Sequence, residues 1–325
     1  MDRIVLRNTS LESSVLGFGC VSLTTHSTRK QALAMLELVL ENGITHFDVA
    51  RSYGVGQAEG ILGEFLRGKR DRVTVTTKFG LEPPAGSARY RRLFGIARKA
   101  VRVVPGLKSL IVRRVRLVEP APFLPQKASR SLETSLRELG TDHIDVFLLH
   151  EATLGDASQP ELLGFLEEQV AKGTIRYYGI GAGFGKYPED AALLPTGLKV
   201  LQFDHSPVAP NIDRLRSAQS RALITFGTVA CAKHVMAQAR ARPELTRRRS
   251  AEVGADLSDR AVVASLLLRW AVTANVGGIA LFATTKRQNL LSNLQHFSSR
   301  RYTTAQLSAF TKFCREVAVR PAPGT

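Results

Sequence analysis

The sequence predicts an α/β protein, a closed (β/α)8 barrel. Short apolar runs alternate with longer amphipathic segments, and short links between such units indicate a parallel sheet. Eight strand–helix units fit within the 325 residues, a usual size for one barrel. A doubly wound open sheet is the alternative fold. Its glycine-rich G-x-G-x-x-G loop is incomplete here, because the early stretch "GFGCVS" (17–22) lacks the final glycine.

The N-terminal part of the chain is expected to begin with a short hairpin at 3–15 that caps the barrel. We expect strands at 15–20, 44–50 and 72–78, and helices at 29–43 and 58–68. Gly43 stands where helices commonly end in a left-handed residue. The run at 72–78 is rich in β-branched residues, which favour strands.

The rest of the chain continues the same alternation. We expect strands at 143–150, 174–181, 199–206, 222–228 and 276–284. Helices are expected at 128–140, 160–173, 187–194, 211–220, 258–272, 286–297 and 304–318. The run at 143–150 is almost entirely apolar, as a strand buried on both faces should be. Ser258 is the candidate N-cap of the helix that it opens.

The chain is strongly basic, with a net charge of +17. Much of this charge lies in a long insertion at 81–127, after the third strand. A second basic stretch at 242–250 is also interpreted as an insertion. For the first insertion three interpretations remain open: a lid that favours acidic or phosphorylated substrates, a patch for a membrane surface or nucleic acid, and a solvated loop. We favour the lid, since Tyr90 and Phe94 are too few to stack on single-stranded nucleic acid.

The composition does not favour several classes of protein. Cys20, Cys231 and Cys314 are far apart and give neither a disulfide framework nor zinc-ligand spacing, so no metal site is expected. No apolar run is long enough to span a membrane, and charges interrupt any signal-like run at the N-terminus. We therefore expect a cytoplasmic enzyme whose residues 1–325 form one domain. The sequence leaves its oligomeric state open.

Four polar side chains stand where predicted strands end, which is where the chemistry of a parallel barrel is found. Asp48 ends the second strand and Tyr53 follows it, while Lys78 ends the third strand and His150 the fourth. A lysine beside the tyrosine lowers the pKa of the phenol, and a buried lysine needs a carboxylate partner such as Asp48. A histidine there orients a substrate carbonyl group. The set therefore predicts a proton donor for an oxygen atom that gains negative charge.

These residues stand in motifs that resemble the aldo-keto reductase family over nearly the whole chain. The motifs are "GITHFDVARSYG" (43–54), "TTKFG" (76–80), "LGTDHIDVFLLH" (139–150), "VAKGTIRYYGIG" (170–181) and "LLLRWAV" (266–272). The resemblance implies that Asp48, Tyr53, Lys78 and His150 form the catalytic tetrad of the family. It also implies a nicotinamide cofactor, which supplies a hydride that no side chain can deliver.

The resemblance further implies which residues hold this cofactor. Gln202 matches the glutamine that binds the carboxamide, and Phe226 matches the aromatic ring that stacks on the nicotinamide. The other expected contacts are the phosphate-side loop of Gly227, Thr228 and Val229, the phosphate contacts Thr284, Thr285 and Lys286 at a helix N-terminus, and Asn293 beside the adenine.

The cofactor segments depart from the family pattern at two places. Gly181 and Ala182 replace a Ser-Asn pair after the fifth strand, so the carboxamide is held mainly by Gln202. The last loop lacks the lysine and arginine of NADPH-preferring members, and Lys286 and Arg287 are the neighbouring cations. We expect NADP(H) to bind with these two residues as anchors, and NAD(H) is the alternative cofactor.

The sequence therefore predicts an oxidoreductase that transfers hydride reversibly between a nicotinamide cofactor and a carbonyl or alcohol group, with Tyr53 as general acid and base. The expected substrate is a small aldehyde, ketone or sugar-like molecule. The alternative is a nucleotide-binding regulatory or interaction barrel with little turnover, which the missing Ser-Asn pair suggests. Nucleic-acid binding through the basic insertion is a third class, and we do not favour it.

Overall fold

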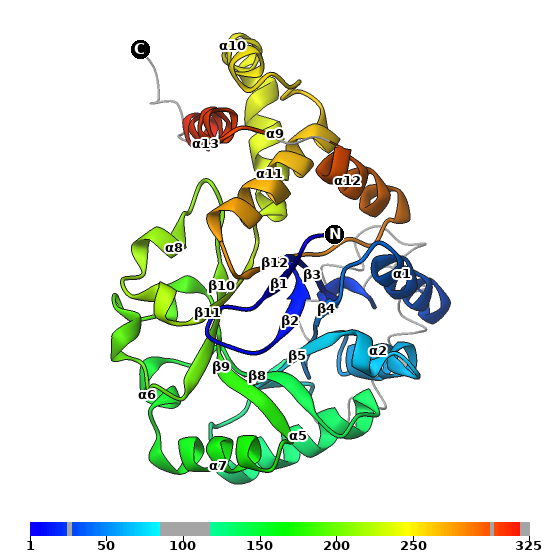
Figure 1. The fold of residues 1–325 in the computed structure, drawn as a ribbon, viewed down its shortest axis with the longest axis vertical. Helices are drawn as coiled ribbons and strands as arrows, with labels where there is room; N and C mark the ends of the chain where they lie inside the picture. The colour runs from blue at the N-terminus through cyan, green and yellow to red at the C-terminus, as the bar shows by residue number, and fades with distance from the viewer. Residues whose placement is uncertain (25–27, 85–117, 300–301, 319–325) are drawn as a thin grey trace.

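Eight parallel strands close into a barrel with helices outside it (Figure 1). The computed structural model describes residues 1–24, 28–84, 118–299 and 302–318. The strand order is β3-β4-β5-β8-β9-β10-β11-β12, and β12 pairs with β3 to complete the ring. The predicted (β/α)8 fold is confirmed. Residues 85–117 of the predicted basic insertion lie outside the described part of the chain.

The barrel strands are short and their carboxyl ends meet at one mouth. They are β3 (Leu16–Gly19), β4 (His46–Asp48), β5 (Thr74–Phe79), β8 (Ile144–His150), β9 (Ile175–Gly181), β10 (Leu198–Asp204), β11 (Ala222–Phe226) and β12 (Ile279–Phe282). The register places Gly181 opposite both His150 and Gln202, and Asp48 opposite Gly19. Polar residues of strands far apart in sequence are thereby brought to the same level of the barrel.

The helices follow the strands in the order expected for this fold. They are α1 (Arg29–Glu41), α2 (Ala58–Leu66), α5 (Pro125–Leu139), α6 (Leu154–Ala157), α7 (Pro160–Ala171), α8 (Asn211–Arg214), α9 (Ala232–Ala241), α10 (Pro243–Val253), α11 (Arg260–Ala274), α12 (Arg287–Ser299) and α13 (Thr304–Ala318). Thr28 and Gln31 form a capping box that starts α1. Gly43 follows this helix with φ +79°, as predicted. None of the helices in the described ranges is long and apolar enough to cross a membrane.

Several predicted elements differ from the structure in extent or type. The helix expected at 187–194 is replaced by 3-10 turns at Phe184–Lys186 and Ala191–Leu193. The helix expected at 211–220 is one turn, α8, followed by a 3-10 turn at Ala218–Ser220. Helix α5 begins at Pro125 and not at 128, because proline fits the first turn of a helix. The N-cap of α11 is Asp259 and not Ser258, since the Asp259 carboxylate accepts hydrogen bonds from the first backbone amides.

The second basic stretch belongs to the connection from β11 to β12, in which α9 and α10 precede α11. Residues 242–250 lie mostly in α10, which packs against α9 and α13 over an apolar cluster that includes Val253 and Phe313. Arg249 is only 5% exposed and is paired with Glu316 of α13. Figure 1 shows α9, α10, α11 and α13 gathered on one side of the barrel. Neither α9 nor α10 was predicted from the sequence.

Two small antiparallel ladders complete the fold. The predicted hairpin consists of β1 (Arg3–Val5) and β2 (Glu12–Ser14), and its Leu6 and Leu11 pack into the apolar interior of the barrel. The second ladder pairs β6 (Leu81–Glu82) with β7 (Glu119–Pro120). It joins the two ends of the segment that leaves β5 and returns to α5.

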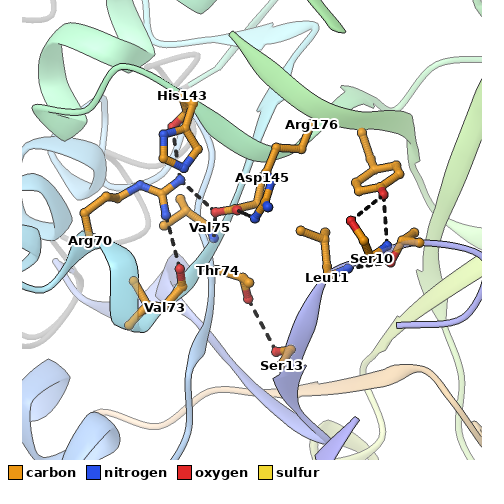
Figure 2. A network of polar contacts seen from close by, with 12 residues as sticks. Ser10, Leu11, Ser13, Arg70, Val73, Thr74, Val75, His143, Asp145 and Arg176 are labelled. Atoms are coloured by element: carbon orange, nitrogen blue, oxygen red, sulfur yellow. Dashed lines mark hydrogen bonds and ion pairs between the residues drawn. The ribbon is translucent and has the colours of Figure 1, made fainter. Parts of the chain in front are cut away.

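A buried carboxylate ties the amino ends of three strands together (Figure 2). Asp145, at the start of β8, is 1% exposed and accepts hydrogen bonds from Arg70 Nη2 at 2.7 Å and from Val75 N at 2.9 Å. Arg176 of β9 reaches the other carboxylate oxygen at 3.2 Å. Nearby, the Tyr177 hydroxyl accepts a hydrogen bond from the Ser10 amide at 2.9 Å. The end of the barrel opposite the mouth is thus held by polar contacts.

Replacing Asp145 with alanine should lower the free energy of unfolding by about 3–5 kcal/mol, because the Arg70 guanidinium and the Val75 amide lose a buried acceptor. Arg176→Ala is the matched control. The Arg176 side chain is 49% exposed, so its loss should cost at most about 1 kcal/mol. Chemical unfolding at neutral pH measures both values. Equal effects of the two substitutions would contradict the structural role of Asp145.

Candidate active site

A cavity of about 760 Å³ opens at the mouth of the barrel. The four predicted catalytic residues, Asp48, Tyr53, Lys78 and His150, all line it. Asp48 ends β4, Lys78 lies near the end of β5 and His150 ends β8, while Tyr53 stands in the loop after β4. The barrel therefore brings together the four side chains that the strand-end pattern selected.

Lys78 is the centre of this group. Its side chain is 1% exposed, and Nζ donates to Asp48 Oδ1 at 2.6 Å, to Tyr53 Oη at 3.1 Å and to the Val49 carbonyl oxygen at 3.2 Å. These acceptors use all three protons of the ammonium group. Burial alone would lower the pKa of Lys78, but Asp48 and Tyr53 together raise it above its ordinary value. The lysine is thus held as a cation.

The pKa of Tyr53 is raised, contrary to the direction expected from the sequence. Burial of the phenol is the largest cause, and Lys78 opposes it by favouring the phenolate. The sequence analysis identified the influence of Lys78 correctly. It omitted burial, which is a property of the fold and outweighs the lysine.

His150 faces Tyr53 as a neutral imidazole. The two rings meet edge to face, with centroids 6.1 Å apart. Burial is the main cause that lowers the pKa of His150 to about 3, and the charges of Lys78 and Lys186 lower it further. The buried Nδ1 atom has no hydrogen-bond partner among the described residues. The next residue, Glu151, also lines the cavity and has a left-handed backbone with φ +62°.

Gln202 is part of the same hydrogen-bonded chain. Its Nε2 donates to Asp48 Oδ2 at 2.6 Å, so both carboxylate oxygens of Asp48 are occupied. The other end of the amide, Oε1, is turned toward Gly181. A Cβ atom on Gly181 would lie 3.1 Å from this oxygen, and the glycine therefore leaves it open to the cavity. Sequence reasoning assigned Gln202 to a ligand and did not foresee its bond to Asp48.

The structure brings most of the predicted cofactor residues to this cavity, but not all of them. Gly181, Gln202, Phe226, Gly227, Val229, Thr284 and Asn293 line it. Thr228, Thr285, Lys286 and Arg287 are not part of the lining. Thr228 is buried, and its hydroxyl donates to the His205 carbonyl oxygen at 2.6 Å. The side chains of Lys286 and Arg287 are exposed, and their predicted phosphate contact stays a prediction.

Besides Glu151, three charged residues that were not selected from the sequence line the cavity: Lys233, Asp259 and Arg260. Lys233 lies in the first turn of α9, which was not predicted. Asp259 and Arg260 start α11. The strong helical pattern that begins at residue 258 was the only sequence signal for Asp259 and Arg260. It places both side chains at the start of a helix and therefore near the mouth of the barrel.

This arrangement is suited to moving a proton at the bottom of a cavity. A phenol lies between a lysine ammonium and a neutral imidazole, and a carboxylate fixes the ammonium. Such a phenol donates a proton to an oxygen atom that gains negative charge, and the lysine stabilises the phenolate that remains. In the described ranges, no cluster of three or more histidine, cysteine or acidic side chains is arranged to hold a metal ion.

Comparisons with known proteins place the chain among oxidoreductases. A family model described as the aldo/keto reductase family matches residues 15–315. The chain is 26% identical over 331 residues to the uncharacterized oxidoreductase YqkF of Bacillus subtilis, with 96% of each chain covered. It is 25% identical over 207 residues to the aldo-keto reductase yakc (NADP(+)) of Schizosaccharomyces pombe, which covers 61% of this chain and 51% of that relative.

A solved structure shows the same fold. The holo form of aldo-keto reductase AKR11C1 from Bacillus halodurans superposes with a TM-score of 0.69 at 20% sequence identity, and the match covers 96% of both chains. The family model extends over nearly all of the barrel, and its match agrees with the motifs in the sequence. The protein is therefore an oxidoreductase of the aldo/keto reductase family.

Proposed function

We propose that this protein transfers hydride reversibly between a nicotinamide dinucleotide and the carbonyl or alcohol group of a small aldehyde, ketone or sugar-like molecule. The observation that carries this proposal is the position of Lys78 Nζ, which donates to both Asp48 and Tyr53 at the bottom of the cavity. A regulatory barrel with little turnover would not need a buried lysine held in contact with a tyrosine.

In the proposed reduction, Tyr53 Oη donates its proton to the carbonyl oxygen as negative charge develops there. Lys78 stabilises the resulting phenolate, and Asp48 keeps the ammonium in place. The neutral imidazole of His150 holds the carbonyl oxygen by a hydrogen bond and so orients it. The nicotinamide ring supplies the hydride when it is bound. In the oxidation of an alcohol, the same phenolate accepts the proton.

The cavity residues fit a nicotinamide dinucleotide. Gln202 Oε1 is an acceptor for the carboxamide, and Gly181 leaves it accessible. Phe226 provides an aromatic surface in the cavity, and Asn293 of α12 provides a polar contact farther from the tetrad. The name of the Schizosaccharomyces pombe relative includes NADP(+), which supports NADP(H) as the cofactor here. NAD(H) remains the alternative.

Tyr53→Phe should reduce turnover by about a hundredfold or more, because the proton donor is lost. Binding of the oxidised cofactor should change little. Tyr177→Phe is the matched control, since its hydroxyl contacts Ser10 at the opposite end of the barrel. Steady-state rates with a panel of aldehydes, ketones and sugars, with each cofactor, measure the effect. Similar rates in Tyr53→Phe and in Tyr177→Phe would remove Tyr53 from the mechanism.

Lys78→Met should slow turnover and shift the pH dependence of alcohol oxidation. Lys78 lowers the pKa of Tyr53, so its loss raises that pKa further. Oxidation needs the phenolate, and its rate increases with pH through the pKa of Tyr53. The rising limb should therefore move to higher pH in Lys78→Met. An unchanged profile, measured as kcat/KM against pH, would contradict the proposed role of Lys78.

The rate of carbonyl reduction should stay constant between about pH 5 and 8, the range in which an ordinary histidine changes its charge. The pKa of His150 is lowered to about 3, so the imidazole remains neutral throughout this range. Tyr53 remains protonated, because its pKa is raised. The measurement is kcat/KM for reduction across these pH values. A transition at the ordinary histidine pKa would show that His150 titrates during catalysis.

A further inference from the structure

Two cationic side chains from helices outside the barrel line the cavity. Lys233 lies in the first turn of α9 and Arg260 is the first residue of α11. These helices pack against each other, and α11 packs against α12, whose Asn289 and Ser292 line the same cavity. Figure 1 shows the three helices together on one side of the barrel, away from α5 and α7.

Both cations are available to a ligand. Within the described part of the chain, neither side chain forms an ion pair or a hydrogen bond, and both are exposed. The acidic residue beside them is already engaged, because Asp259 Oδ1 accepts from Ala261 N at 2.6 Å and from Val262 N at 3.3 Å. An excess of positive charge therefore remains at this end of the cavity.

The cavity itself indicates which part of a dinucleotide would reach these cations. Tyr53 and Gln202 line it at the barrel strands, and the uncharged Gly227, Val229 and Ala230 line it along the loop that leads from β11 to α9. The pyrophosphate lies in the middle of an extended dinucleotide and would face this loop. The adenosine half would then lie among α9, α11 and α12.

We propose that Lys233 and Arg260 bind the 2′-phosphate of NADP(H) and so determine the choice between NADP(H) and NAD(H). This inference rests on the proposed function, which places a dinucleotide in the cavity. A phosphate dianion needs cations that can donate charge-assisted hydrogen bonds, and lysine and arginine both provide them. Lys286 and Arg287, the cations expected from the sequence, are outside the cavity lining. This assignment to α9 and α11 competes with the contact at Lys286 and Arg287 that the sequence predicts, and the affinities of the variants decide between them.

Calorimetric titration of the purified full chain tests the inference without relying on turnover. The wild type should bind NADP+ at least about tenfold more tightly than NAD+. Lys233→Ala and Arg260→Ala should each weaken the binding of NADP+ by about tenfold, and the double variant should weaken it by about a hundredfold. This is the effect expected when charge-assisted hydrogen bonds are lost. The affinity for NAD+ should change by less than about twofold in the same variants. The affinity for adenosine 2′,5′-bisphosphate should change across the variants as the affinity for NADP+ does. The affinity for adenosine 5′-monophosphate should change as the affinity for NAD+ does.

Lys286→Ala combined with Arg287→Ala tests the competing assignment, because these exposed cations are the anchors that the sequence predicts. If Lys233 and Arg260 hold the 2′-phosphate, this variant should keep its affinity for NADP+ and for NAD+. Lys233→Arg, which keeps the charge, should retain tight binding of NADP+. Thermal unfolding of each variant verifies that the barrel is intact.

Three results would overturn the inference while the proposed function stands. The first is an equal loss of affinity for NADP+ and NAD+ in the Lys233 and Arg260 variants. The second is a selective loss of affinity for NADP+ in the Lys286 and Arg287 variant. The third is a wild type that binds NAD+ as tightly as NADP+. An equal loss of affinity for both cofactors would indicate that Lys233 and Arg260 bind the pyrophosphate, which both cofactors contain. A wild type that binds neither dinucleotide would remove the proposed function together with the inference.

Discussion

The mouth of this barrel is organised around a buried ammonium group. Removing a charge from water costs several kcal/mol or more unless partners replace the lost hydration. Lys78 finds its acceptors on β4 and in the loop that follows it, and one of these acceptors is Asp48, which Gln202 of β10 fixes in turn. The neighbouring strand and its loop thus satisfy the ammonium, while Gln202 from the other half of the barrel holds Asp48 in place. The complete hydrogen-bonded chain therefore exists only in the closed barrel.

Much of the fold and the position of the tetrad could be predicted, because both follow from local periodicity. Apolar runs mark the strands, and Asp48, Lys78 and His150 are the polar residues at their ends. The bond from Gln202 to Asp48 could not be predicted, since it joins residues 154 positions apart. The raised pKa of Tyr53 could not be predicted either, because burial depends on how the whole mouth packs.

The C-terminal helices show where composition misled the sequence analysis. The arginines of 242–250 suggested an insertion rather than a core element, but α10 buries Arg249 against Glu316 while its other basic side chains remain in solvent. A charged helix with few large apolar residues has little periodicity of its own and forms because α9 and α13 pack against it. Because α9 was not predicted, Lys233 was not selected from the sequence. The two cations that line the cavity were identified only in the three-dimensional structure.

The β6–β7 ladder has a consequence for how this barrel can change during evolution. It pairs the two ends of a long connection directly at the rim, and the Ala121 amide donates to the Gly80 carbonyl oxygen at 2.9 Å beside it. The register between β5 and β8 is therefore set without the segment that the ladder encloses. The entropy of closing a loop grows slowly with length, by about 0.6 kcal/mol for each doubling. Insertions and deletions in the segment between β6 and β7 therefore cost the barrel little stability. The residues around the mouth can change while the catalytic residues are conserved.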